Sequence, residues 1–486
     1  MLSRRTFLQG SAAALQAAKP NFLFILADDH AGYVLGADGN SRAETPNLDR
    51  LASQGTRFAS HFCNSPVCTP SRQSFLTGQM PHAAGVTVLK TPLDGQKPTI
   101  AKQLKQAGYQ TAVFGKMHFN RQSEPGLHGF DHLLTEQDLA KVWTARESRP
   151  IPKGIATKPP WKPFADPARI WLNAENLPYP RHEADMRSAT LLDQAARYLK
   201  ENRGKQTATW VSFQEPHSPY DFPLEDRNHF TASQFKAPVP GKEDAWQIPL
   251  IFRDLSDEEK QGIAAAYYNS VRYLDRNIGR LLELVDDSTV IVYMADHGYS
   301  LGQHGRFEKH CCYEPALRVP LIIRWPAKVR RGVVTDMTES IDIAPTILDL
   351  LRAPPLSIAH GQSLRSYLEG KRPAHPRDHI FSEYLENEEA CIRTAQYKFI
   401  HCSGKRERTD GYKTDSPTPG RYIRLYDLKA DPGEFTDLAA AKPKVVAELQ
   451  ALMLKRFRDT HPEASSEPKH AATDEILDWY LRPRDA

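Results

Sequence analysis

The chain has 486 residues, with 63 Lys and Arg against 59 Asp and Glu, so its formal net charge is only +4. This near balance argues against nucleic acid as a partner, because nucleic-acid-binding domains carry a strong basic excess. The length and the 40% of hydrophobic residues allow a large core. After residue 18, no apolar run reaches the roughly 20 residues that cross a bilayer, so we expect no membrane span in the mature chain.

The N-terminus resembles a twin-arginine export signal. Arg4 and Arg5 precede a short apolar, alanine-rich stretch that ends near residue 18. We assign residues 1–18 to this signal and expect a periplasmic or extracellular protein. Such compartments permit disulfides, and Cys391 and Cys402, which flank a predicted strand pair, are the best candidates among the six cysteines.

Apolar stretches of strand length alternate with helical patterns over most of the chain. Helices are predicted at residues 45–51, 99–107, 185–201 and 257–284, the last from an i, i+3, i+4 apolar stripe. The alternation predicts an α/β fold in residues 19–375, with a large, mostly parallel sheet flanked by helices. Its strands are expected at residues 21–27, 56–62, 110–114, 207–213, 289–295 and 319–326.

Past residue 375 the pattern changes, because strands follow one another without helices between them. Strands are predicted at residues 379–384, 391–401 and 421–428, and a helix at residues 443–458. We expect residues 376–486 to form a small C-terminal α+β subdomain with an antiparallel sheet. Its polar loop at residues 404–420 is expected to be a solvated hairpin tip, with a wall of a binding site as the alternative.

Charged residues follow directly after four of the predicted parallel strands. The carboxyl ends of such strands meet at one edge of the sheet, where α/β proteins bind ligands. Carboxylates there suit Ca²⁺ or Mg²⁺, while lysine and histidine suit the binding of a tetrahedral oxyanion and proton transfer. The pattern predicts transfer or hydrolysis of a phosphoryl-like or sulfuryl-like group. The residues are Asp28 and Asp29, Lys116 and His118, His217, and Asp296 and His297.

The pentapeptide Cys68-Thr69-Pro70-Ser71-Arg72 stands at the start of a predicted helix, so its thiol and guanidinium could hold an anion together. Taken alone, it equally fits a buried structural cysteine. Together with other segments, it resembles the signature of the type I sulfatases, which belong to the alkaline phosphatase superfamily. These segments are Leu76-Thr77-Gly78, Ala27-Asp28-Asp29, Gly115-Lys116-Met117-His118, Pro216-His217, Asp296-His297-Gly298, Lys309 and Leu425-Tyr426-Asp427-Leu428.

The resemblance implies a sulfatase domain in residues 19–375 and oxidation of Cys68 to formylglycine by a dedicated maturation enzyme. It implies one Ca²⁺ ion, favoured over Mg²⁺, held by Asp28, Asp29, Asp296, His297 and the modified side chain at position 68. This chain departs from the commoner family pattern at two positions. Many members have Asn where this chain has His297, and Trp is commoner where it has Met117. The implied catalytic residues have separate roles. Arg72 steadies the formylglycine, and Lys116 and Lys309 contact sulfate. His118 helps the aldehyde hydrate turn over, and His217, together with Lys309, protonates the leaving oxygen.

The implied function is hydrolysis of sulfate esters of a carbohydrate or another small organic alcohol. Two alternatives stay open: a formylglycine-dependent hydrolase of phosphonate monoesters or phosphodiesters, and an inactive protein that binds sulfated glycans. A complete set of motif residues favours the enzyme. We expect the loops at residues 143–180, 218–254 and 404–420 to select the substrate.

Overall fold

A computed structural model describes residues 19–159, 168–406, 411–414 and 421–485, and the predicted export signal lies outside them. Its centre is an eight-stranded sheet in the order β5-β4-β6-β1-β7-β8-β2-β9. The strands are β1 (Phe22–Ala27), β2 (Thr56–Phe58), β4 (Gln110–Gly115), β5 (His132–Thr135), β6 (Thr207–Ser212), β7 (Val290–Ala295), β8 (Leu321–Arg324) and β9 (Gly332–Val334).

Four neighbouring strands at the middle of this sheet, β4, β6, β1 and β7, run parallel, whereas β8 is antiparallel to both of its neighbours. Every residue of β1, β6 and β7 is buried. These strands lack polar alternation because both faces of the sheet are covered, as is usual for parallel sheets. The predicted α/β class with a mostly parallel sheet is confirmed.

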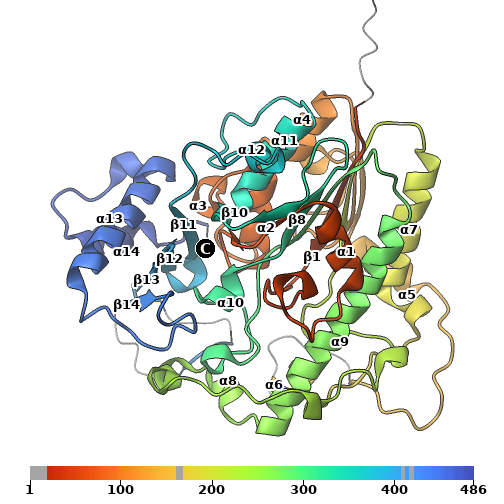
Figure 1. Cartoon of the computed structure of the whole chain (residues 1–486), viewed down its shortest axis with the longest axis horizontal. Coiled ribbons are helices and arrows are strands. Elements are labelled where there is room, and N and C mark those ends of the chain that lie inside the picture. The colour runs from red at the N-terminus through yellow and green to blue at the C-terminus, as the bar shows by residue number, and fades with distance from the viewer. Residues whose placement is uncertain (1–18, 160–167, 407–410, 415–420, 486) are drawn as a thin grey trace, which may run out of the picture.

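The helices form two groups, one on each side of the large sheet (Figure 1). One group contains α2, α4, α11 and α12, and the other contains α1, α5, α7 and α9. The long helix α9 begins with a capping box between Ser256 and Glu259, which satisfies N–H groups of its first turn. The bounds are α1 (Pro46–Gln54), α2 (Cys68–Thr77), α4 (Ile100–Gln106), α5 (Glu136–Thr144), α7 (Arg187–Glu201), α9 (Asp257–Leu282), α11 (Ile343–Leu350) and α12 (Arg365–Leu368).

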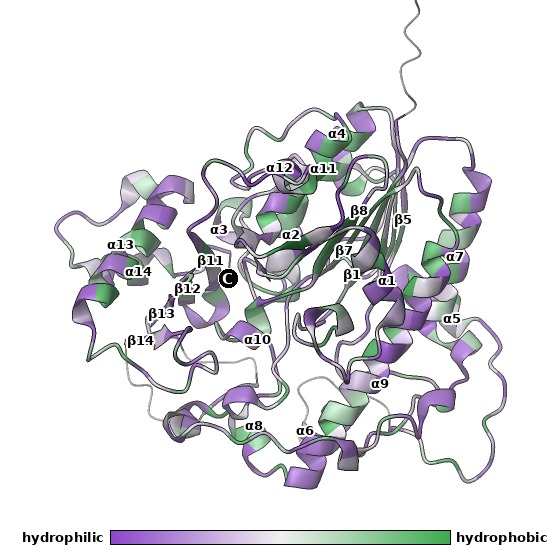
Figure 2. Ribbon diagram, viewed as in Figure 1, coloured by the Kyte–Doolittle hydropathy of each residue, from purple (hydrophilic) through white to green (hydrophobic). Residues whose placement is uncertain are grey.

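Hydropathy follows this layering, with the strands of the large sheet apolar and the flanking helices mixed (Figure 2). Short elements complete the first part of the chain, and β3 pairs with β10 in a separate two-stranded sheet. In the part of the chain that the structure describes, no helix is both long and apolar enough to cross a membrane. The short elements are β3 (His61–Phe62), β10 (Thr338–Glu339), α3 (Pro81–Ala84), α6 (Ala168–Trp171), α8 (Leu250–Arg253) and α10 (Glu314–Leu317).

The C-terminal part contains a four-stranded antiparallel sheet in the order β11-β12-β13-β14, as predicted. Two helices cover it, and their aromatic side chains Phe457 and Tyr480 stack with ring centroids 4.8 Å apart. This core also takes in Met80 and Ile341, so apolar contact joins the C-terminal part to the first part of the chain. The elements are β11 (His379–Tyr384), β12 (Glu389–Thr394), β13 (Tyr397–Cys402), β14 (Tyr422–Asp427), α13 (Pro443–Thr460) and α14 (Thr473–Tyr480).

Two sequence predictions about this framework are wrong. The single strand expected at residues 56–62 is divided into β2 and β3, which pair in different sheets. The disulfide between Cys391 and Cys402 is absent, and none of the six cysteines, all of which the structure describes, forms a disulfide. In the β12–β13 register Cys391 lies opposite Ile400 and Cys402 opposite Glu389, so the two cysteines are diagonal rather than facing neighbours.

The buried histidine of β3 makes folding stability depend on pH. His61 is fully buried and its Nδ1 lies 2.9 Å from the Thr338 hydroxyl. Burial lowers the pKa of His61 to about 3, although Glu339 raises it and Arg377 lowers it further. An unfolded histidine has a pKa of about 6.5, so near pH 5 the unfolded state binds a proton that the folded state does not.

We therefore predict that lowering the pH from 7 to 5 destabilises the wild type more than the His61→Gln variant, by about 2 kcal/mol. Urea unfolding at both pH values measures this difference. His375→Gln, which changes an exposed histidine, is the matched control and should keep the wild-type pH dependence. Equal pH dependence in the wild type and His61→Gln would contradict the prediction.

Candidate active site

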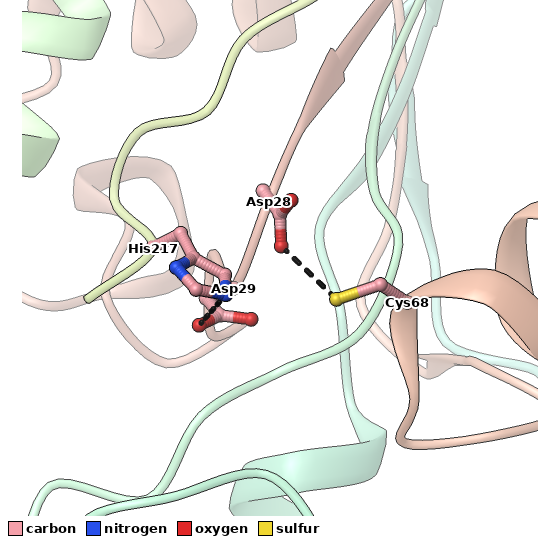
Figure 3. A group of neighbouring side chains, drawn as sticks. All are labelled: Asp28, Asp29, Cys68 and His217. Carbon is pink, nitrogen blue, oxygen red and sulfur yellow. Dashed lines mark hydrogen bonds and ion pairs between the residues drawn. The ribbon is translucent and has the colours of Figure 1, made fainter. Parts of the chain in front are cut away.

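The four central parallel strands bring the predicted residues to one edge of the sheet. Asp28 and Asp29 follow β1, Lys116 follows β4, His217 lies beyond β6, and Asp296 follows β7. Because β4, β6, β1 and β7 are neighbours in this order, their carboxyl ends lie side by side. Figure 3 shows Asp28, Asp29 and His217 gathered opposite the Cys68 sulfur.

Cys68 enters this group from the first turn of α2, a helix whose residues are all buried. Its Sγ lies 3.2 Å from His297 Nε2, 3.3 Å from Lys309 Nζ and 4.0 Å from Lys116 Nζ. Burial alone would raise the pKa of the Cys68 thiol, but Lys116, Lys309 and His297 hold that pKa well below its ordinary value. The pocket around position 68 therefore favours negative charge.

Arg72 lies one helical turn beyond Cys68 and ties α2 to the sheet edge. Its Nε donates to Asp296 Oδ2 at 2.8 Å, and its Nη2 lies 3.1 Å from Asp28 Oδ2. Its Nη1 donates to the Lys116 carbonyl and, at 2.9 Å, to Ser212 Oγ. A fully buried guanidinium with these partners fixes the start of α2 relative to three strand ends.

Asp29 lies close to Lys309, His297 and His217. It has a φ of 68°, and its Oδ1 accepts from Lys309 Nζ at 2.7 Å and lies 3.3 Å from His297 Nδ1. Its Oδ2 lies 4.0 Å from His217 Nε2. Although burial lowers the pKa of His297, Asp296 and Cys68 raise it to about 9.

The turn after β4 presents Lys116 and His118. Gly115 has a φ of 94°, and a Cβ there would lie 1.9 Å from the Ser212 carbonyl oxygen, so only glycine fits. The Lys116 Nζ forms an ion pair with Asp28 Oδ2. Burial and then the Lys116 charge lower the pKa of His118, so its imidazole is neutral at pH 7.

Glu136 is a supporting residue that the sequence analysis missed. Its two carboxylate oxygens accept from the backbone N–H groups of Met117 and His118 at 3.1 and 3.2 Å. The Gln73 amide, on α2, donates to the carbonyls of the same two residues. The Glu136 carboxylate and the Gln73 amide thus both fix the backbone of the turn after β4. No local motif marks Glu136, because its role depends on the contact between α5 and this turn.

The buried carboxylates suit a divalent cation. Asp28, Cys68, Asp296 and His297 each offer a ligand atom, and these atoms lie within 4.8 Å of one another; Asp28, Asp29, Cys68 and His217 form an overlapping group. Asp29 Oδ2 is buried and accepts no hydrogen bond within the described residues. Oxygen donors with unused lone pairs fit a hard cation better than they fit an apolar interior. The predicted ligand residues therefore fit a metal site.

A cavity of about 410 Å³ opens above this cluster. It brings together the predicted residues Asp29, Cys68, Lys116, His118, His217 and Lys309, whereas Asp28, Arg72, Asp296 and His297 are fully buried. Tyr412 lines the cavity and is 2% exposed, so the expectation that the loop at residues 404–420 is a solvated tip is wrong there. Further lining residues that the sequence analysis did not single out include Leu89, Gln137, Arg187, Gln214, Tyr299 and His310.

Comparison with known proteins identifies the family. The profile of the family described as Sulfatase matches residues 20–353, and the profile described as N-sulphoglucosamine sulphohydrolase, C-terminal, matches residues 302–462. The first match covers more than half of the chain and contains every predicted site residue.

Similar proteins include an N-acetylglucosamine-6-O-sulfatase of Bacteroides thetaiotaomicron, 29% identical over 92% of this chain and 88% of its own. A choline-sulfatase of Rhizobium meliloti is 27% identical over 91% and 87% of the two chains. Among solved structures, a phosphonate monoester hydrolase from Silicibacter pomeroyi is 26% identical with a TM-score of 0.75, covering 92% of this chain and 97% of its own. The chain belongs to the sulfatase family, enzymes that hydrolyse sulfate esters.

Proposed function

We propose that the protein is an exported sulfatase that uses a formylglycine formed from Cys68 and one bound Ca²⁺ ion to hydrolyse the sulfate ester of a carbohydrate or another small alcohol. The convergence of Cys68 with Lys116 and Lys309 above three buried carboxylates carries this proposal. In this proposal residues 1–18 are the export signal, residues 19–375 the sulfatase domain and residues 376–486 the C-terminal subdomain.

The side chain at position 68 is the proposed nucleophile, held by its helix and by Arg72. Once hydrated, a formylglycine aldehyde has one hydroxyl that attacks sulfur and a second whose deprotonation releases sulfate, whereas an ordinary serine would remain sulfated. His118 is positioned to take up that proton, because it lines the cavity and its Nδ1 has no hydrogen-bond partner within the described residues.

Two lysines bind the sulfuryl oxygens in this proposal. Lys116 and Lys309 approach the Cys68 sulfur at 4.0 and 3.3 Å, and both are buried, so their charges act where little water screens them. Asp28, Asp29, Asp296, His297 and the side chain at position 68 would hold the cation, which would supply further positive charge to this end of the cavity.

His217 is the proposed acid for the leaving oxygen, assisted by Lys309. Its Nδ1 lies 2.7 Å from the Ser218 carbonyl oxygen, which can only accept, so Nδ1 carries the proton of the neutral ring. Nε2 therefore faces Asp29 and the cavity as the atom that gains and loses a proton.

A hydrolase of phosphonate monoesters or phosphodiesters is the second candidate, favoured by the similarity to the phosphonate monoester hydrolase structure. The site chemistry alone does not separate the two, because both substrates place anionic oxygens around a tetrahedral centre. The sulfatase profile and the named sulfatase relatives favour sulfate. An inactive glycan-binding protein is disfavoured because every proposed catalytic position carries the residue that the reaction needs.

We predict that protein produced with a formylglycine-generating enzyme hydrolyses 4-nitrophenyl sulfate faster than a matched phosphonate monoester. Mass spectrometry should show a lower mass for the peptide that contains residue 68, because the thiol is replaced by an aldehyde. Cys68→Ala should abolish both activities, and Cys402→Ala, on β13 and outside the cavity lining, should retain them. Faster turnover of the phosphonate would establish the second candidate instead.

We predict that His217→Ala impairs poor leaving groups more than good ones. An aliphatic alkoxide needs a proton as the S–O bond breaks, whereas 4-nitrophenolate leaves without one, so the loss should be about 10²- to 10⁴-fold on an alkyl sulfate and much smaller on 4-nitrophenyl sulfate. Steady-state rates on both esters measure the difference. His375→Ala serves as the control, and equal losses on the two esters would assign the proton transfer to another group.

We predict that Ca²⁺ stabilises the protein relative to EDTA, by about 2.7 kcal/mol when its free concentration is a hundredfold above Kd. Thermal unfolding over a series of Ca²⁺ concentrations measures this effect. Asp29→Asn should weaken the concentration dependence because it removes a charged ligand. Asp287→Asn changes a carboxylate whose side chain is 79% exposed and should leave the Ca²⁺ concentration dependence intact. Equal effects of both substitutions would mean that the ion binds elsewhere.

A further inference from the structure

A second cavity of about 420 Å³ adjoins the active-site cavity. Both cavities are lined by Arg187, Gln214 and His217. Only the active-site cavity is lined by Cys68, Lys116 and Lys309. In the proposed reaction, His217 protonates the leaving oxygen, so this oxygen lies beside His217. The alcohol part of the substrate therefore extends past His217 toward Arg187 and the second cavity, which we call the outer cavity.

Arg187, the first residue of α7, has only neutral hydrogen-bond acceptors. Its Nη1 donates to Gln214 Oε1 at 2.6 Å, and its Nη2 donates to the carbonyl oxygen of Glu136. Its side chain is partly buried and forms no ion pair with any residue that the structure describes. The guanidinium thus stands in the wall of the cleft without a carboxylate in direct contact.

The carboxylates nearest to this charge are all engaged elsewhere. Glu136 accepts from two backbone N–H groups of the turn after β4. Asp221 pairs with Lys158 Nζ at 2.9 Å. Glu215 is buried, and its Oε2 accepts from Ser188 Oγ at 2.6 Å.

The outer cavity is lined by aromatic as well as charged side chains. Trp143 and Tyr179 line it, with ring centroids 5.7 Å apart. The Arg181 guanidinium lies 4.7 Å from the Trp143 ring centroid, and the Lys158 ammonium lies 4.8 Å from that of Tyr179. Aromatic faces with a few fixed polar groups suit a sugar ring, and the Arg187 charge in the same wall suits an acidic one.

We propose that Arg187 determines specificity by binding a second anionic group, a carboxylate or another sulfate, on the alcohol part of the substrate. The substrate class is then an acidic sulfated saccharide whose ring occupies the outer cavity. A partly buried arginine without a carboxylate partner is costly, and a planar anion that accepts two of its N–H groups removes that cost only when substrate binds. This inference rests on the proposed function, because the ester at Cys68 fixes the other end of the substrate.

The test uses three matched pairs of sulfate esters that differ in one negative charge. They are 3- and 4-carboxyphenyl sulfate against their carboxamides, and glucosamine 6-sulfate with an N-sulfo against an N-acetyl group. We expect the wild type to prefer the anionic member of at least one pair in kcat/KM, and Arg187→Met to reduce that preference about 10- to 100-fold. Arg187→Lys keeps the charge but not the planar fork and should restore part of it.

Arg203→Met, at an exposed arginine beyond the other end of α7, is the matched control and should keep the preference of the wild type. No preference in any pair, or a preference that persists in Arg187→Met, overturns the inference. Absence of 4-nitrophenyl sulfate hydrolysis would instead overturn the proposed function. In that case calorimetric binding of the same pairs to Cys68→Ala still decides about Arg187, because binding needs no turnover.

Discussion

The buried contacts of Arg72 are the constraint on which the site depends. One guanidinium joins Asp28 after β1, Asp296 after β7 and the Lys116 carbonyl after β4, and it does so from the helix that carries Cys68. Removing one partner of a buried ion pair typically costs about 3–5 kcal/mol, because the other charge is left without compensation. The same contacts therefore keep α2 seated on the sheet and place the residue at position 68 above the carboxylates.

Much of this arrangement follows from the sequence, for a physical reason. The apolar runs that become β1, β4, β6 and β7 each end in charged residues, and parallel strands bring their carboxyl ends to one edge. What the pattern could not supply was the strand order, since nothing local shows that β6 lies between β4 and β1. Pairing partners are also long-range properties, which is why the run at residues 56–62 did not reveal its division between two sheets.

The residues missed by the sequence analysis act through tertiary contact. Glu136 stands at the start of α5 and could be a surface residue of any amphipathic helix, until the fold places it under the backbone of Met117 and His118. Tyr412 belongs to a polar loop whose composition favours solvent exposure, yet its ring packs 4.8 Å from His310 beside Lys309. Composition describes the average environment of a loop, whereas one aromatic side chain can be buried within it.

Charge is distributed differently in the two halves of the cleft. At the catalytic end, Arg72, Lys116 and Lys309 each face a buried carboxylate, so their positions are fixed before any substrate arrives. Toward the outer cavity, Arg187 has neutral acceptors only. The inner half can therefore stabilise charge on any tetrahedral anion of suitable size, sulfuryl or phosphonyl. Discrimination between substrates then has to come from the alcohol side, where a second negative charge changes the interaction with Arg187 most.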